Sequence, residues 1–371
     1  MLESIRVANF RGIRECEVRG LADVNVFLGR NGAGKSTLLE AIYLASSCAE
    51  PVDPVRGLPK ADYVIRRRGG RGDWNTHRGV LWFMKDVEKD IEITLRFKSS
   101  AELSLKIPYK TPSASSPVWL ELASEDALEI SKSAGFSGAA RLYFSPQLDW
   151  LWNPETDEIR IGADIAIREK LLAALKGELE YLRGVALLDG RILTSDIEQR
   201  VWARLLDRRL DKLIVELVRE EYEPSVESIL YKPVGGGFAL ALALRDTTVE
   251  LDALGDGARM AVLYASPLVL AGNTAVLVED PEAHQHPGGL TALMRFALKI
   301  AKERRLQLFI STHSIELVNI AKVACEELGL KLRVFHMERD SRGVVDVRAL
   351  DSADLEVLQK MGLDPRLLHV L

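Results

Sequence analysis

Cysteine is scarce in this chain of 371 residues, and the three that are present are Cys16, Cys48 and Cys325. An odd number of cysteines without a CxxC spacing excludes a disulfide framework and a zinc ribbon. His284 and His286 form an HxH pair, but the sequence offers no third ligand at a recognisable spacing. We therefore expect neither disulfides nor zinc, and a reducing cytoplasm as the location of the protein.

Long apolar runs are also missing. The two longest, at residues 261–272 and 275–278, are shorter than the roughly 20 residues that cross a bilayer. Charged and polar side chains interrupt the first ten residues, which argues against a signal peptide. The sequence therefore predicts no membrane span and no membrane partner.

An excess of positive charge is lacking as well, because 49 lysines and arginines are set against 54 aspartates and glutamates, for a net charge of −5. Nucleic acid binding by the whole surface, as in small basic domains, is thereby excluded. Two basic stretches remain, RRRGGRGD at residues 66–73 and the arginine-rich residues 200–212. For each of them, a solvated surface and a phosphate-binding surface are both open.

What is present is the composition of a folded protein, with 47% hydrophobic and 28% charged residues. The length fits one large domain with an insertion. The apolar patterns of residues 5–10 and 24–28 predict strands, and residues 36–49 have helical spacing. Short alternating runs in residues 80–123 predict an antiparallel β lobe.

Apolar residues recur at helical spacing between residues 164 and 221, which predicts two long helices. Ser195 and Glu198 have the spacing of a capping box at the start of the second helix. Strand patterning returns at residues 229–251, and from residue 257 helices alternate with strands, as in a parallel α/β sheet. We therefore expect an α/β fold in three parts: residues 1–160 with the β lobe, an inserted helical hairpin at 161–225, and residues 226–371.

The strongest motif is GRNGAGKS at residues 29–36, which matches the pattern GxxxxGK followed by serine and lies between a strand and a helix. Its glycines let backbone amides converge on phosphate oxygens, and the helix N-terminus adds partial positive charge. We expect Lys35 to reach the β and γ phosphates and the Ser36 hydroxyl to bind Mg²⁺. The predicted ligands are ATP and Mg²⁺, and the other residues expected at the nucleotide are Asn31, Gly32, Ala33, Gly34 and Thr37.

A second cluster of polar residues follows a predicted strand in AVLVEDPE, residues 275–282. Parallel sheets bind ligands at the carboxyl ends of their strands, where one carboxylate can hold Mg²⁺ and a neighbour can orient water. LFISTH at residues 308–313 repeats this format, and His313 can donate a hydrogen bond to a γ phosphate or to the attacking water. A solvated acidic turn and a structural histidine are the alternatives.

With these motifs in this order, the chain resembles the ABC-type ATPase heads of the AAA annotation class, relatives of RecF, of SMC heads and of the ATPase half of the OLD nucleases. The resemblance covers nearly the whole chain except the helical insertion. It rests on NFRG at residues 9–12, Walker A at 29–36, the signature motif LGDGAR at 254–259, Walker B with its D-loop region at 278–287, and the switch histidine in STH at 311–313.

The resemblance implies a P-loop NTPase in which two heads sandwich two ATP molecules. By position, Glu279 is the Walker B carboxylate that binds the metal, and Asp280 occupies the position of the catalytic base. Lys35 and His313 complete the implied catalytic set. The remaining contacts that the resemblance implies are Arg11 to the nucleotide, Gln147 as a Q-loop ligand of the metal, and Gly255, Asp256 and Gly257 to the γ phosphate of the other head.

Two departures from the family pattern bear on turnover. Gly255 stands where a serine is usual, and Asp280 replaces a glutamate, so the base is shorter by one methylene and we expect slow hydrolysis. Glu282 stays open as an alternative base. The expected function is an ATP-hydrolysing molecular switch, forming a homodimer with ATP and coupled to a protein or nucleic acid effector.

A DNA-binding repair ATPase of the RecF or SMC kind is the alternative. Two further classes are disfavoured by missing motifs. An OLD-type nuclease is not expected because the sequence after His313 contains no DxD motif and offers too little room for the nuclease domain. A GTPase is not expected because the chain contains no NKxD motif.

Overall fold

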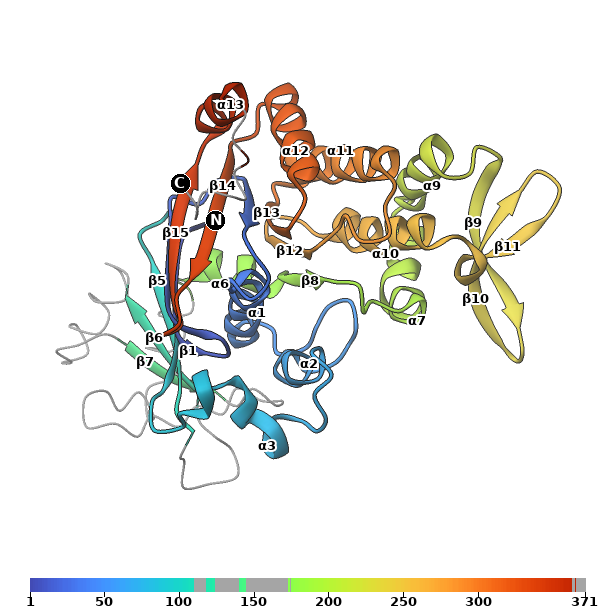
Figure 1. The fold of residues 1–371 in the computed structure, drawn as a ribbon. Helices are drawn as coiled ribbons and strands as arrows, with labels where there is room; N and C mark the ends of the chain where they lie inside the picture. Colours follow the sequence, from blue (N-terminus) through green and yellow to red (C-terminus); the bar gives the residue numbers. More distant parts are fainter. Residues whose placement is uncertain (110–117, 124–139, 145–172, 174, 362–363, 365–371) are drawn as a thin grey trace.

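A mixed β-sheet with helices on both faces forms the body of the protein, as seen in the computed structural model of Figure 1. The structure describes residues 1–109, 118–123, 140–144, 173, 175–361 and 364. Within this part of the chain the sheet has twelve strands, in the order β7-β6-β5-β4-β1-β2-β15-β14-β3-β13-β12-β8. Both sequence predictions of sheet type, an antiparallel lobe and a parallel α/β half, are confirmed.

The antiparallel half of the sheet comprises β1 (Leu2–Phe10), β2 (Ile13–Arg19), β4 (Ile91–Phe97), β5 (Glu102–Ile107), β6 (Val118–Ala123) and β7 (Ala140–Phe144). The parallel half comprises β14 (Leu332–Arg339), β3 (Val24–Leu28), β13 (Gln307–Thr312), β12 (Ala275–Glu279) and β8 (Ala186–Leu188). Between the halves lies β15 (Val344–Leu350), which pairs antiparallel with β14 and parallel with β2.

Successive residues of the parallel strands enter two different cores. In β3, Phe27 packs into the core that includes the buried residues of α1, whereas Val26 and Leu28 pack into the core on the opposite face of the sheet. Strand residues alternate between faces, so a strand covered on both sides is mostly apolar. In β3 the one polar residue is Asn25, whose buried amide is hydrogen-bonded to the backbone of Ala22 and Leu308. The parallel pairing of β13 with both β3 and β12 places the carboxyl ends of these three strands along one edge of the sheet.

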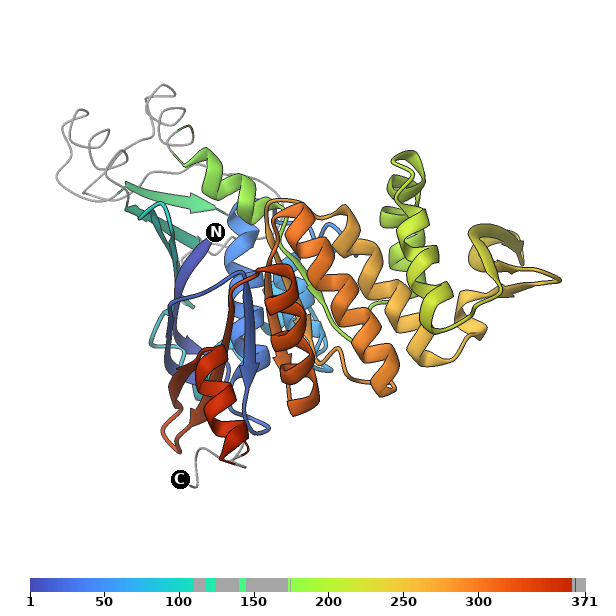
Figure 2. The same ribbon diagram turned by 90° about the horizontal axis from the view of Figure 1, so that it is seen from above.

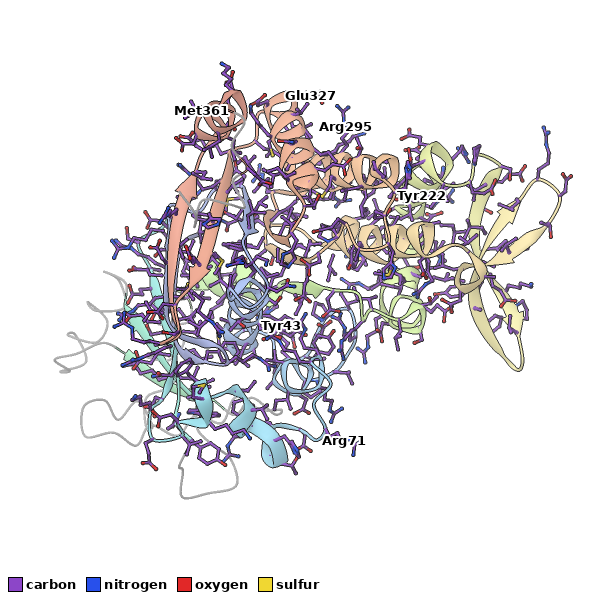
Figure 3. The ribbon with its side chains drawn as sticks, in the orientation of Figure 1. Tyr43, Arg71, Tyr222, Arg295, Glu327 and Met361 are labelled. Carbon is purple, nitrogen blue, oxygen red and sulfur yellow. The ribbon has the colours of Figure 1, made fainter. Side chains whose placement is uncertain are left out.

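Helices cover each face in turn. The core that includes Phe27 is closed by α1 (Lys35–Ala45), α2 (Lys60–Arg66), α3 (Trp74–His77) and α6 (Lys176–Arg183). The opposite core is closed by α9 (Asp211–Glu221), α10 (Asp256–Leu270), α11 (Pro287–Arg304), α12 (Ile315–Leu328) and α13 (Ser352–Lys360). Figure 2 shows α10, α11 and α12 side by side on this face.

The prediction of two long helices between residues 164 and 221 is wrong for the residues that the structure describes. Strand β8 interrupts the segment and pairs with β12, with Leu187 opposite Leu277. The second predicted helix is divided into α7 (Thr194–Ile197), a π-helical turn at Glu198–Trp202, α8 (Ala203–Asp207) and α9. A short apolar run such as 185–188 has no periodicity that separates a buried strand from a helix, which explains the error.

The capping box predicted for Ser195 and Glu198 is also wrong. The helix begins earlier, and the backbone N–H of Leu193 donates to Oδ2 of Asp196 at 3.0 Å. Glu198 instead accepts a hydrogen bond from the backbone N–H of Leu240, at 2.5 Å. The carboxylate of Glu198 thus joins the inserted segment to the next part of the chain.

Residues 226–250 form a separate antiparallel sheet, as the strand patterning predicts. It consists of β9 (Val226–Val234), β10 (Gly237–Leu244) and β11 (Thr248–Glu250), and it projects from the body in Figure 1. In the part of the chain that the structure describes, no helix is both long and apolar enough to cross a membrane. The division into parts at residues 160 and 225 remains a prediction.

Candidate functional site

The phosphate-binding loop lies where the sequence predicts it, between the end of β3 at Leu28 and the start of α1 at Lys35. Gly29, Gly32 and Gly34 all have positive φ, at 154°, 80° and 105°. A Cβ at Gly29 would lie 2.4 Å from the carbonyl oxygen of Met337, so only glycine fits there. The loop conformation therefore depends on its glycines.

The N-terminus of α1 is open to an anion. Gly34 is its N-cap, no side chain caps it, and its first turn contains no acidic residue. The first amides of a helix lack intrahelical partners, and their dipoles favour a negative charge. An uncapped helix end that faces a glycine loop therefore fits a phosphate group.

Lys35 is buried at the base of this loop, with 5% of its surface exposed. Its Nζ donates to the carbonyl oxygens of Gly29 at 2.7 Å and Arg30 at 3.2 Å, and lies 3.0 Å from Nε2 of His313. Burial lowers the pKa of Lys35 to about 8, although the carboxylates of residues 279–282 oppose this shift. The ammonium thus connects the glycine loop with the acidic strand end.

Glu279 is the last residue of β12 and Asp280 follows it, next to the end of β13 at the same edge of the sheet. Asp280 has a φ of 43°, and its backbone N–H donates to the carbonyl oxygen of Ser311 at 3.0 Å. Its Oδ1 also accepts from the Ser311 hydroxyl at 3.3 Å. Burial raises the pKa of Asp280 to about 6, and the charges of Glu282 and Glu279 add to this rise.

Glu282 connects the loop after β12 with the strand end that carries His313. Its Oε1 accepts from the Thr312 hydroxyl at 2.6 Å and from the backbone N–H of His313 at 2.9 Å. Burial and the nearby ammonium of Lys35 lower the pKa of His313. The neutral imidazole can therefore act as a hydrogen-bond donor or acceptor beside Lys35.

The signature motif does not contact the phosphate-binding loop of the same chain. Gly255 is the N-cap of α10, and the carbonyl oxygen of Gly257 accepts from Nε2 of Gln285 at 2.9 Å. Asp256 lies 3.8 Å from Nδ1 of His284. Among the described residues, no hydrogen bond or ion pair joins residues 255–257 to residues 29–37. The start of α10 therefore packs against the loop after Walker B and not against Walker A.

The contacts predicted for Arg11 and Gln147 are not tested by the structure. Nε of Arg11 lies 2.6 Å from Oε2 of Glu40 on α1, and burial lowers the pKa of Arg11 to about 10. Its contact with a nucleotide remains a prediction. Gln147, the predicted Q-loop residue, lies outside the described residues.

The other residues expected at the nucleotide either line a cavity or make a hydrogen bond within the chain. Residues 30–33, which include Asn31, Gly32 and Ala33, line a cavity of about 260 Å³ together with residues 336–339 at the end of β14. The hydroxyl of Thr37 accepts from Nη2 of Arg68 at 3.1 Å. In the part of the chain that the structure describes, no three histidine, cysteine or acidic residues gather as a metal cluster.

Sequence reasoning missed Arg67, which it placed in an exposed basic loop. Its side chain is 4% exposed and pairs with Glu40, Asp189 and Glu279, which are 27, 122 and 212 residues away in the chain. No spacing in the sequence signals such partners, because the order of strands in the sheet brings them together.

The residues at this edge suit ATP and Mg²⁺ as ligands. The glycine loop and the open end of α1 offer amides to phosphate, and Lys35 offers a positive charge. The hydroxyl of Ser36 and the carboxylate of Glu279 are oxygen donors of the kind that Mg²⁺ prefers. The donor set therefore fits both groups.

Comparisons with known proteins agree with this geometry. Residues 1–142 match the family model of the AAA ATPase domain. The chain is 20% identical to a protein from Helicobacter pylori named ATP/GTP phosphatase, over 93% of this chain and 94% of that protein. It is 39% identical to the DNA double-strand break repair Rad50 ATPase of Pyrococcus abyssi over 71 residues, which are 19% of this chain and 8% of Rad50.

A solved structure is similar in fold. It is the Smc head domain of Pyrococcus furiosus with an extended coiled coil, bound to the C-terminal domain of ScpA. The TM-score is 0.52 at 13% identity, over 97% of this chain and 99% of that chain. The fold, the phosphate-binding loop and the family match over residues 1–142 together support an ATPase head of the AAA and ABC-like class.

Proposed function

We propose that this ATPase head is a molecular switch that binds ATP, hydrolyses it slowly, and dimerises head to head around it. The observation that carries the proposal is the convergence of Lys35, His313 and the carboxylates of residues 279–282 at one edge of the sheet, with Lys35 Nζ 3.0 Å from His313 Nε2. Phosphoryl transfer needs little more than positioning and charge stabilisation, and these residues supply both.

Each residue has a distinct part in the proposed reaction. Lys35 and the first amides of α1 oppose the charge of the β and γ phosphates. Ser36 and Glu279 would hold Mg²⁺, which would neutralise phosphate charge. Asp280 orients the attacking water and accepts its proton, and His313 donates a hydrogen bond to the γ phosphate.

Asp280→Asn should lower ATP hydrolysis by about 100-fold, since a positioned general base contributes about 10²–10⁴-fold. Nucleotide binding should persist, because asparagine also tolerates the φ of 43° at this position. Phosphate release and calorimetric ATP binding are measured for both proteins.

Glu282→Gln is the matched control for this substitution. Glutamine retains an oxygen that can accept from Thr312 and from the backbone N–H of His313, so hydrolysis should stay close to the wild-type rate. The opposite pattern, with a slow Glu282→Gln and an active Asp280→Asn, would transfer the base role to Glu282.

Coupling to nucleic acid is a second candidate function, favoured by one surface of the inserted segment. The basic side chains of residues 200–212 are exposed, and among the described residues no carboxylate lies within 4 Å of them; they are Arg200, Arg204, Arg208, Arg209 and Lys212. These exposed basic side chains lie on the π-helical turn, on α8, in the turn after it and at the start of α9, and such side chains suit a phosphate backbone.

Arg204→Glu combined with Arg208→Glu should weaken binding to duplex DNA and flatten its dependence on salt by about one unit of slope for each lost phosphate contact. Fluorescence anisotropy at several salt concentrations measures both quantities. Equal affinity and slope in the double variant and the wild type would remove this surface as a candidate.

A further inference from the structure

Arg67 uses every nitrogen of its guanidinium on a different carboxylate. It lies directly after α2, and its side chain is 4% exposed. Nε donates to Oδ2 of Asp189 at 3.0 Å, Nη1 contacts Glu40, and Nη2 contacts Oε2 of Glu279. One buried side chain therefore joins α1, the residue after β8 and the end of β12.

Only arginine can make this connection. The guanidinium is a flat fork with donors in fixed directions, whereas a lysine ammonium is a single point of charge. A buried charge is costly unless it is paired and hydrogen-bonded, and here the guanidinium is paired with a carboxylate at each of its three nitrogens. The arrangement is therefore more specific than a surface ion pair.

The three carboxylates differ in their access to the candidate site. The side chains of Glu40 and Asp189 are 0% and 2% exposed, whereas Glu279 is 18% exposed. Arg67 contacts Oε2 of Glu279, and among the described residues no hydrogen bond is made to the other oxygen, Oε1. Arg67 thus fixes the carboxylate while leaving one of its oxygens free for a ligand.

The contact between Arg67 and Glu40 also links Arg67 to the helix that carries Ser36. Glu40 lies four residues after Ser36 on α1, so the two side chains share one face of the helix. Arg67 contacts Glu40 and Glu279 with adjacent nitrogens. The guanidinium therefore fixes the helix that carries Ser36 relative to the strand that carries Glu279.

We propose that Arg67 is a positioning residue for the metal: it sets the orientation of Glu279 and its distance from Ser36. This inference rests on the proposed function, in which these two side chains bind Mg²⁺. Partners that orient a metal-binding carboxylate typically contribute about 10–100-fold to metal affinity.

Arg56 provides a matched control within the same buried network. Its side chain is 2% exposed, and it donates to Asp189 at 2.9 Å and to Asp53 at 3.2 Å. In the described part of the chain it makes no contact with Glu279. Arg56→Lys therefore disturbs the network as Arg67→Lys does, without touching the proposed metal ligand.

The test measures Mn²⁺ binding by electron paramagnetic resonance in the presence of saturating ADP. Arg67→Lys should weaken Mn²⁺ binding by about 10-fold or more, whereas Arg56→Lys should bind Mn²⁺ like the wild type. ADP affinity in EDTA should be nearly the same in all three proteins, because Lys35 and the loop amides remain. Melting temperatures identify any general loss of stability.

Glu40→Gln supplies a second variant that keeps the shape of the side chain. It removes the charge that Arg67 contacts on α1, which Arg11 and Arg68 also contact, and should weaken Mn²⁺ binding in the same direction as Arg67→Lys. Equal Mn²⁺ affinity in Arg67→Lys and Arg56→Lys, or wild-type affinity in Glu40→Gln, would overturn the inference alone. Wild-type protein that binds Mn²⁺ no better with ADP than without it would overturn the proposed metal site as well.

Discussion

Lys35→Ala should bind ATP about 100-fold more weakly than the wild type, since hydrogen bonds to charged groups contribute about 1.5–3 kcal/mol and a factor of ten corresponds to about 1.4 kcal/mol. The ammonium is already directed at the phosphate loop, where it donates to the carbonyl oxygens of Gly29 and Arg30. Removing it leaves the loop amides alone to oppose the phosphate charge. Isothermal titration calorimetry measures the difference.

Lys60→Met is the control for this prediction. Lys60 is another buried lysine, at the start of α2, and its Nζ donates to the Ser46 hydroxyl at 2.8 Å. The methionine variant loses a buried ammonium outside the phosphate loop and should bind ATP like the wild type. If wild-type protein fails to bind millimolar ATP, or if Lys35→Ala binds it equally well, the phosphate-loop assignment is incorrect.

The Asp280→Asn protein with ATP should sediment at twice the 41.2 kDa mass of the chain, whereas the nucleotide-free protein should not. Within one chain, the start of α10 packs on residues 284–285, so the phosphate loop lacks the signature residues on its open side. A two-fold partner can supply them, which makes the interface isologous and places two nucleotides in it. Sedimentation velocity with and without ATP measures the change.

Gly255→Arg should block this dimer while leaving ATP binding by the monomer intact. A Cβ at Gly255 meets no atom within 4 Å, so the arginine side chain extends into open space. Gly257 is less suitable than Gly255 for this substitution. A Cβ at Gly257 would lie 3.2 Å from the carbonyl oxygen of His284, so an arginine there would disturb the fold of the monomer itself. If the sedimentation mass is the same with and without ATP, in both the wild type and Asp280→Asn, the head-to-head dimer around ATP is refuted.

The phosphate loop could be predicted from the sequence because its requirements are local. Gly29, Gly32 and Gly34 occupy positive φ, and the residues on either side form the expected strand and helix. A contiguous motif of this kind specifies its own backbone. The strand ends that carry Glu279 and His313 were predictable for a similar reason, since buried parallel strands are apolar runs.

The inserted segment was predicted less well because its elements are short. Strand β8 spans three residues and is stabilised by pairing with β12, and Glu198 accepts from Leu240 instead of capping a helix. Such choices depend on neighbours that are distant in the chain. Local propensity gave no preference strong enough to reveal them.

The sequence by itself determined that this protein has a phosphate-binding loop followed by acidic and histidine-bearing strand ends. Only the tertiary structure decided that Arg67 contacts Glu279, 212 residues further along the chain, and that the start of α10 packs against residues 284–285. The physical reason is that glycine and periodicity constrain the nearby backbone, whereas the partner of a buried charge depends on which strands lie side by side in the folded sheet.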